Sequence, residues 1–106
     1  MRLLIAIIAL TLNLSLTIEA KADTTAQPKE WTLLLYLNGN NNLDSFGALN
    51  LNQIEKIGST DKINVVVQWA SLANGKTQRL YMKKDNDATK VTSPVIEDMG
   101  AVDMGD

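Results

Sequence analysis

The chain has 106 residues, a formal net charge of −2, and neither cysteine nor histidine. Without these two residue types, the chain cannot form a Cys–His or Ser–His–Asp catalytic constellation or a zinc site built from Cys and His. The slightly acidic balance gives no electrostatic reason to expect a nucleic-acid partner. We expect one small domain at most, because a chain of this length can bury only a thin core.

The first 22 residues have the organisation of a secretory signal peptide. Arg2 provides a positive start, Leu3–Leu12 is apolar, and Ala20-Lys21-Ala22 gives the small-residue pattern of a cleavage site. We predict cleavage after Ala22 and a secreted or periplasmic product. The apolar core is about half of the roughly 20 residues that a membrane-spanning helix needs. We therefore expect no stable membrane insertion after cleavage, and the alternative is an uncleaved anchor.

Residues 23–30 are polar and include Pro28, which indicates a flexible leader. The domain is then expected to begin with Trp31–Leu37, a continuous apolar run that ends in an asparagine-rich turn, Asn38–Asn42. Such a run is typical of a strand that is buried on both faces. Strands of this kind occur mostly in parallel sheets that are covered by helices on both sides.

A helical period follows this turn. Apolar residues recur three to four positions apart, which predicts a helix from Leu43 or Asp44 to Ile57. Gly58 is placed just past its carboxyl end, where a positive φ is wanted. The next apolar run, Ile63–Trp69, predicts a second strand. Strand, helix and strand with short joins form a βαβ unit, so the two strands should be parallel.

The rest of the chain predicts a hairpin and loops. Asn74-Gly75 is a turn signal, and Thr77–Met82 alternates as a half-exposed strand does, so we expect it to pair antiparallel to the second strand. Asp85-Asn86-Asp87 resembles the start of a calcium loop but lacks the following Gly and Glu, which favours an exposed turn. Ser93–Ile96 is a short extended segment, and Glu97–Asp106 is expected to be a loop.

Four polar residues are candidates for substrate binding. Ligands of parallel α/β sheets are usually held just past the carboxyl ends of the strands. The turn after the first predicted strand occupies that place, and it offers Asn38, Asn41, Asn42 and Asp44. The alternative is local: Asn and Gly suit tight turns, and Asn41, Asn42 or Asp44 can cap the following helix.

Several separate pieces of the sequence resemble the opening of the clostripain-like cysteine peptidases, peptidase family C11. The resemblance covers nearly all of residues 31–106, and the pieces stand in the same order. They are Trp31–Gly39, Asn41–Asp44, Ile54–Thr60, Ile63–Trp69, Asp98–Gly100 and Val102–Asp106.

The resemblance implies a fold and an activity. The fold would be the amino-terminal part of a caspase-like α/β/α sandwich. Members of the family cleave peptides and proteins after basic residues, chiefly Arg, through a His–Cys dyad in which the thiolate attacks and the histidine protonates the leaving amine. Several mature by internal cleavage and respond to calcium. Loops at the carboxyl ends of the strands build the substrate cleft, where an amide or acidic group would suit a basic side chain.

The chain departs from the family pattern in one decisive respect. The family's His and Cys lie further along than Asp106, so the resemblance assigns no catalytic residue, cofactor or metal ligand to this chain. Two interpretations follow. The chain is either the inactive amino-terminal fragment of a secreted peptidase, whose partner is the remainder of the peptidase domain, or a complete small binding module derived from that fold.

Overall fold

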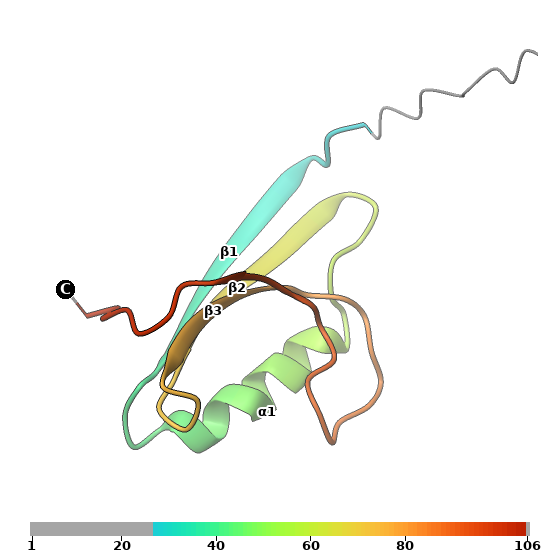
Figure 1. Ribbon diagram of the computed structural model, residues 1–106. Helices are drawn as coiled ribbons and strands as arrows, with labels where there is room; N and C mark the ends of the chain where they lie inside the picture. The colour runs from blue at the N-terminus through green and yellow to red at the C-terminus, as the bar shows by residue number, and fades with distance from the viewer. Residues whose placement is uncertain (1–26, 106) are drawn as a thin grey trace, which may run out of the picture.

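The computed structural model describes residues 27–105, so the predicted signal peptide and most of the leader lie outside the described residues. The protein is a small mixed α/β domain with one four-stranded sheet in the order β1-β2-β3-β4 (Figure 1). The elements are β1 (Trp31–Gly39), α1 (Asp44–Glu55), β2 (Ile63–Ser71), β3 (Lys76–Tyr81) and β4 (Val95–Asp98). No helix within residues 27–105 is long and apolar enough to cross a membrane.

The βαβ unit and the hairpin predicted from the sequence are both confirmed. β1 and β2 pair in parallel from Trp31 beside Ile63 to Gly39 beside Ser71, and β3 pairs antiparallel to β2. Both parallel strands are two residues longer than the apolar runs that predicted them, because main-chain pairing continues from Asn38 beside Ala70 to Gly39 beside Ser71. The helix ends at Glu55, two residues before the predicted end.

The core lies between α1 and the face of the sheet that the helix covers. Leu51 of α1 is fully buried. It forms one core cluster with Val65 and Val67 of β2, with Leu80 of β3, and with Met82, the residue that follows β3. These side chains come from alternate positions of each strand, so they share one face. β2 is thus the central strand of the core, and α1 packs on one side of the sheet only (Figure 1).

The prediction that both parallel strands are buried on both faces is wrong. β1 is an edge strand, and Trp31 and Tyr36 remain 70% and 66% exposed. An apolar run shows that a strand is suited to burial, but it does not show where the strand stands in the sheet. In β2, the alternation that points Val65 and Val67 toward α1 points Asn64 and Gln68 to the opposite face.

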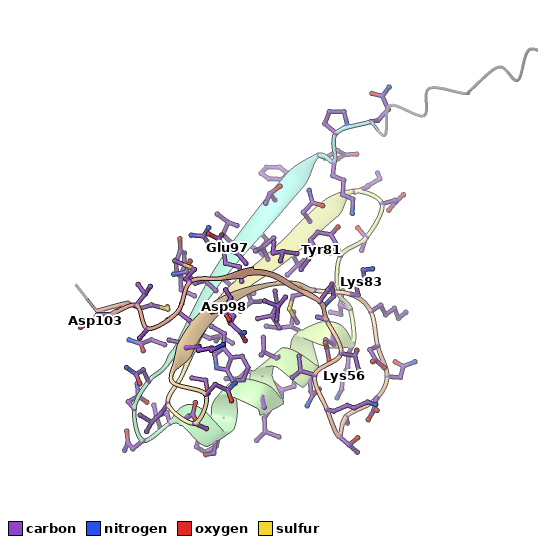
Figure 2. All side chains as sticks on the ribbon, in the orientation of Figure 1. Lys56, Tyr81, Lys83, Glu97, Asp98 and Asp103 are labelled. Atoms are coloured by element: carbon purple, nitrogen blue, oxygen red, sulfur yellow. The ribbon has the colours of Figure 1, made fainter. Side chains whose placement is uncertain are left out.

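Polar side chains link the strands across this opposite face. Asn64 donates to the hydroxyl of Thr32 at 3.3 Å and accepts from the hydroxyl of Tyr81 at 2.9 Å. Gln68 accepts from Arg79 at 2.9 Å. Figure 2 shows Tyr81 and Glu97 above the sheet, with α1 below it. The hydrogen bonds satisfy amide groups that a dry apolar layer would leave unpaired.

The acidic segment predicted as a loop contains a strand. Glu97 and Asp98 belong to β4, which pairs antiparallel to β3 with an irregularity between Arg79 and Leu80. Glu97 forms an ion pair with Arg79, and Asp98 accepts from the ammonium of Lys76 at 3.0 Å. These cross-strand pairs favour a strand at Glu97 and Asp98, although these two residues have low strand propensity.

The carboxyl end of α1 is fixed by a segment from far along the chain. Gly58 has φ of +63°, as the sequence predicted, and the chain turns there so that Ser59 N–H donates to Met82 O at 2.8 Å. The carboxylate of Glu55 is fully buried, and its Oε1 accepts from the backbone N–H groups of Thr92 and Ser93 at 3.0 and 2.7 Å. Residues 83–93 are therefore held against the end of the helix.

Candidate functional site

The carboxyl ends of β1 and β2 lie side by side. Gly39 and Ser71 are neighbours in the parallel register, and Leu72 N–H donates to Gly39 O at 3.3 Å. The turn after β1 and the turn after β2 therefore meet at one edge of the sheet. A side chain on Gly39 would not fit here, because its Cβ would stand 2.8 Å from Ala70 O.

The asparagine-rich turn is organised by its own side chains. Asn38 Oδ1 accepts from Asn40 N–H at 3.3 Å, and Asn41 Nδ2 donates to Asn38 O at 3.0 Å. Asn41 Oδ1 also accepts from Leu43 N–H at 2.8 Å. These short-range bonds fix the turn that leads into α1, which supports the local interpretation of Asn38 and Asn41. Asn42 is exposed.

Asp44 joins the two turns. It is the first residue of α1, but the residue at the N-cap position is Leu43, which makes no side-chain capping bond. The carboxylate of Asp44 accepts from the N–H groups of Leu72 and Ala73 at 3.0 Å each. Of the three residues weighed from the sequence as caps, Asn41 accepts from the N–H of Leu43 at the amino end of the helix, whereas the carboxylate of Asp44 does not cap α1. The carboxylate of Asp44 accepts instead from the turn after β2. The parallel pairing of β1 and β2 brings this turn within hydrogen-bond distance of Asp44.

These hydrogen bonds lower the pKa of Asp44 below its ordinary value. The N–H of Ala73 makes the largest contribution, and burial opposes it in part. Because the ionised carboxylate is the better acceptor, the bonds favour the charged form. Asp44 therefore places a negative charge at the edge of the sheet where the strands end.

A hollow of about 310 Å³ lies beside this edge. Its lining comes from the turn after β1, the hairpin of β2 and β3, and the segment after β4: Asn40, Ala70, Ser71, Gly75, Lys76, Thr77, Ala101, Val102 and Asp103. Thr77 is buried and donates to Val102 O at 3.2 Å, which holds that last segment over β3. Figure 2 shows Asp103 at the end of this segment, beyond the sheet.

The charges around the hollow are mixed. Lys76 is paired with Asp98, whose pKa is lowered first by the N–H of Gly100 and then by the Lys76 side chain. Asp103 adds a carboxylate to the lining. The hollow can therefore accept hydrogen bonds and hold a cationic group, because its lysine is already paired.

The structure brings the four predicted site residues to one edge of the sheet but gives them different environments. None of the four lines the 310 Å³ hollow, whereas Asn40 does. Asn38 lines a separate hollow of about 430 Å³ between β1 and the start of α1. Sequence reasoning missed Lys76 and Asp103, and the Asn74-Gly75 turn signal was the one clue that the hairpin would reach this edge.

The arrangement supplies binding groups without a nucleophile–base pair. The hydroxyl of Ser71 accepts from Asn74 N–H at 3.3 Å, and the chain has no histidine to activate it. Residues 27–105 contain no cluster of three or more acidic side chains that could hold a metal ion. No family model, no curated protein and no solved structure matches this chain.

Asp44→Asn is expected to destabilise the domain at neutral pH and to have less effect in acid. The pKa of Asp44 is lowered in the folded state, so its stabilisation is present above the ordinary value of 3.8 and is lost as pH falls through the lowered value. Urea unfolding of both proteins from pH 7 to pH 3 measures this difference. Asp61→Asn, in the exposed turn before β2, is the matched control and should leave the stability at neutral pH nearly unchanged. A gap between Asp44→Asn and the parent that stays constant below pH 4 would contradict the assignment.

Proposed function

We propose that this chain supplies the amino-terminal part of a secreted clostripain-like cysteine endopeptidase that cleaves after Arg or Lys. The observation that carries the proposal is the edge where β1 and β2 end together. There, the turns after the two parallel strands meet at Asp44, next to a hollow with an acidic lining residue. This is the position at which parallel α/β sheets bind their ligands.

The charge at this edge agrees with a basic substrate side chain. Asp44 and Asp103 are carboxylates, and the one lysine of the hollow is paired with Asp98. Carboxylates form strong charge-assisted hydrogen bonds with guanidinium groups and are favourable partners for lysine. Of the four residues predicted from the sequence, Asp44 is thus the strongest candidate for a role in the cleft, and Asn38 and Asn41 shape the turn that positions it.

The finer fold that we propose is the caspase-like α/β/α sandwich. Its second helical layer would cover the face of the sheet opposite α1. On that face, Leu34 and Tyr36 of β1 are exposed, and Val66 of β2 is half-buried. Large apolar side chains on an open sheet face are suited to such cover.

In this proposal, the catalytic His and Cys belong to a part of the peptidase beyond Asp106. The present chain contributes the first parallel strands, the turn that borders the cleft, and its acidic groups. Without a thiolate and a matched base at hydrogen-bond distance, this part has no means of attacking a peptide carbonyl.

The full 106-residue chain is expected to give background rates on fluorogenic peptides that contain Arg or Lys. Mass spectrometry of the natural secreted product is expected to find a longer polypeptide that includes a histidine and a cysteine. Turnover by the short chain that survives repurification and is abolished by one substitution would contradict the proposal. A natural product that begins at Asp23 and ends at Asp106 would favour the small binding module.

A further inference from the structure

An open strand edge and an apolar groove run together along β1. We propose that two copies of this chain associate through this surface, with β1 of one copy antiparallel to β1 of the other and the two α1 helices side by side. The proposal concerns the chain on its own and does not rest on the peptidase assignment. Its evidence is the contrast between the two edges of the sheet, the groove beside β1, and the area of the exposed surface.

The two edges of the sheet differ in length and charge. β1 has nine residues, WTLLLYLNG, and none of them is charged or a proline. β4 has four residues, ends in Glu97-Asp98 and follows Pro94. Short strands, charges and prolines are the usual devices that prevent edge-to-edge pairing. β4 is short, carries two charges and directly follows a proline, whereas β1 has none of these features, so among the described strands β1 is the one suited to accept a partner strand.

The difference between β1 and β4 also favours a closed dimer over an open assembly. Pairing of β1 with β4 of another copy would leave a free edge at each end and would grow into open assemblies. The acidic, short β4 opposes that arrangement. Antiparallel pairing of β1 with itself uses the same surface twice and closes after two copies. It also places no like charges opposite each other within the paired strands, because β1 carries none.

The groove beside this edge lies on the α1 side of the sheet. It consists of two adjoining hollows of about 430 and 530 Å³, which share Leu37 and Asn50. Its apolar walls are Leu33, Leu35 and Leu37 from β1 and Leu43, Phe46, Ile54 and Ile57 from the α1 region. These helix residues flank Leu51 on the side of α1 toward β1, and Ile54 also packs against the core. The helix therefore presents apolar side chains both to the core and to the groove.

The exposed area is close to that of a stable interface. Trp31 is 70% exposed, Phe46 53% and Ile57 73%, and Leu33 and Leu43 are each about half exposed. Together these side chains leave roughly 500 Å² of apolar surface in water. The main chain of the β1 edge adds its unpaired N–H and C=O groups. The sum approaches the ~800 Å² per partner that standard interfaces bury.

The geometry of the pair is consistent with ordinary packing distances. α1 contacts both β1 and β2, so it lies over the first two strands of its own sheet. Neighbouring strands are ~4.8 Å apart. A twofold axis between the two β1 strands then places the two α1 helices ~10 Å apart, which is a normal distance for packed helices. The two grooves would merge, and Phe46 and Ile57 of each copy would fill the space between the helices.

The test measures the mass of the purified 106-residue chain by light scattering across a concentration series. The parent protein is expected to be a dimer at micromolar concentrations. Phe46→Lys and Ile57→Lys, which place charges in the groove, are expected to raise the dissociation constant at least tenfold. Leu72→Lys and Ile96→Lys are matched controls, because these side chains are similarly exposed, at 56% and 57%, but lie away from the groove. Both controls are expected to remain dimers.

Hydrogen exchange supplies a second readout that does not depend on the variants. The amides of Trp31–Gly39 should be better protected in the dimer than in diluted or Phe46→Lys protein, while β3 should be unchanged. A parent protein that is monomeric up to ~100 µM would overturn the proposal. So would a dimer that both groove variants leave intact, or an assembly that keeps growing with concentration.

Discussion

Glu55→Ala is expected to lower the free energy of unfolding by roughly 2–6 kcal/mol. The Glu55 side chain is fully buried, and its Oε1 accepts two backbone N–H groups, those of Thr92 and Ser93. Alanine removes this acceptor and leaves two donors unsatisfied, each at about 1–3 kcal/mol. The total is a large part of the 5–15 kcal/mol by which domains are usually stable. Denaturant unfolding at one fixed chain concentration measures the loss.

Glu55→Gln is the matched control for this change. Glutamine keeps the shape of the side chain and one oxygen that can accept from Thr92 and Ser93, but its NH2 group takes the place of the buried, unpartnered Oε2, so the loss should be smaller than in Glu55→Ala without vanishing. Hydrogen exchange then localises the effect: the amides of residues 92 and 93 should lose protection in Glu55→Ala and keep it in Glu55→Gln. Equal losses in the two variants, with residues 92 and 93 still protected in both, would contradict the assignment of the stabilisation to these two hydrogen bonds.

The role of Glu55 could not be found in the sequence. Glutamate is ordinarily a surface residue of a helix, and Glu55 stands between Ile54 and Lys56 in a pattern that any amphipathic helix could have. Its burial depends on residues 92 and 93, which lie almost 40 positions further along the chain. A local period predicts the helix, but the partner of a side chain on that helix is decided by tertiary packing.

The same distinction explains the other results. The parallel strands and the hairpin were predictable because apolar periods and turn residues are local signals. The exposure of β1 was not, because its place at the edge depends on the order of strands in the sheet. The second half of β4 was predicted as loop because the strand propensity of Glu97 and Asp98 is low and their partners, Arg79 and Lys76, are about 20 residues away.

The candidate site was predictable in position and only partly in composition. Parallel pairing places the turn after β1 at the edge where β1 and β2 end together, and Asn38, Asn41, Asn42 and Asp44 are all found there. Two features of the site depend on where the turn between β2 and β3 lies in the fold. They are the hydrogen bond from Leu72 to Asp44 and the place of Lys76 in the lining of the hollow. Turn residues such as Asn74-Gly75 predict that the chain reverses direction, but they do not predict which other loop the turn will contact.

Gly58→Ala is expected to cost roughly 2–5 kcal/mol of stability, and two separate effects contribute. Gly58 has φ of +63°, and a left-handed conformation costs an ordinary residue about 1–2 kcal/mol. In addition, an added Cβ would lie 2.4 Å from the backbone N of Lys84 and 2.6 Å from the carbonyl carbon of Lys83. Backbone atoms cannot rotate away as a side chain can, so the segment itself must move, at a further ~1–3 kcal/mol.

Gly75→Ala separates these two effects. Gly75 has a similar φ of +60°, and a Cβ there would meet no atom within 4 Å. This variant should therefore show the conformational cost alone, and the difference between the two variants gives the cost of moving residues 83 and 84. That movement would also strain the bonds from Ser59 to Met82 and from Asp85 to Glu55, which hold the segment to the end of α1. Equal losses at Gly58 and Gly75, measured by urea unfolding at one chain concentration, would show that this segment shifts freely and does not fix the end of the helix.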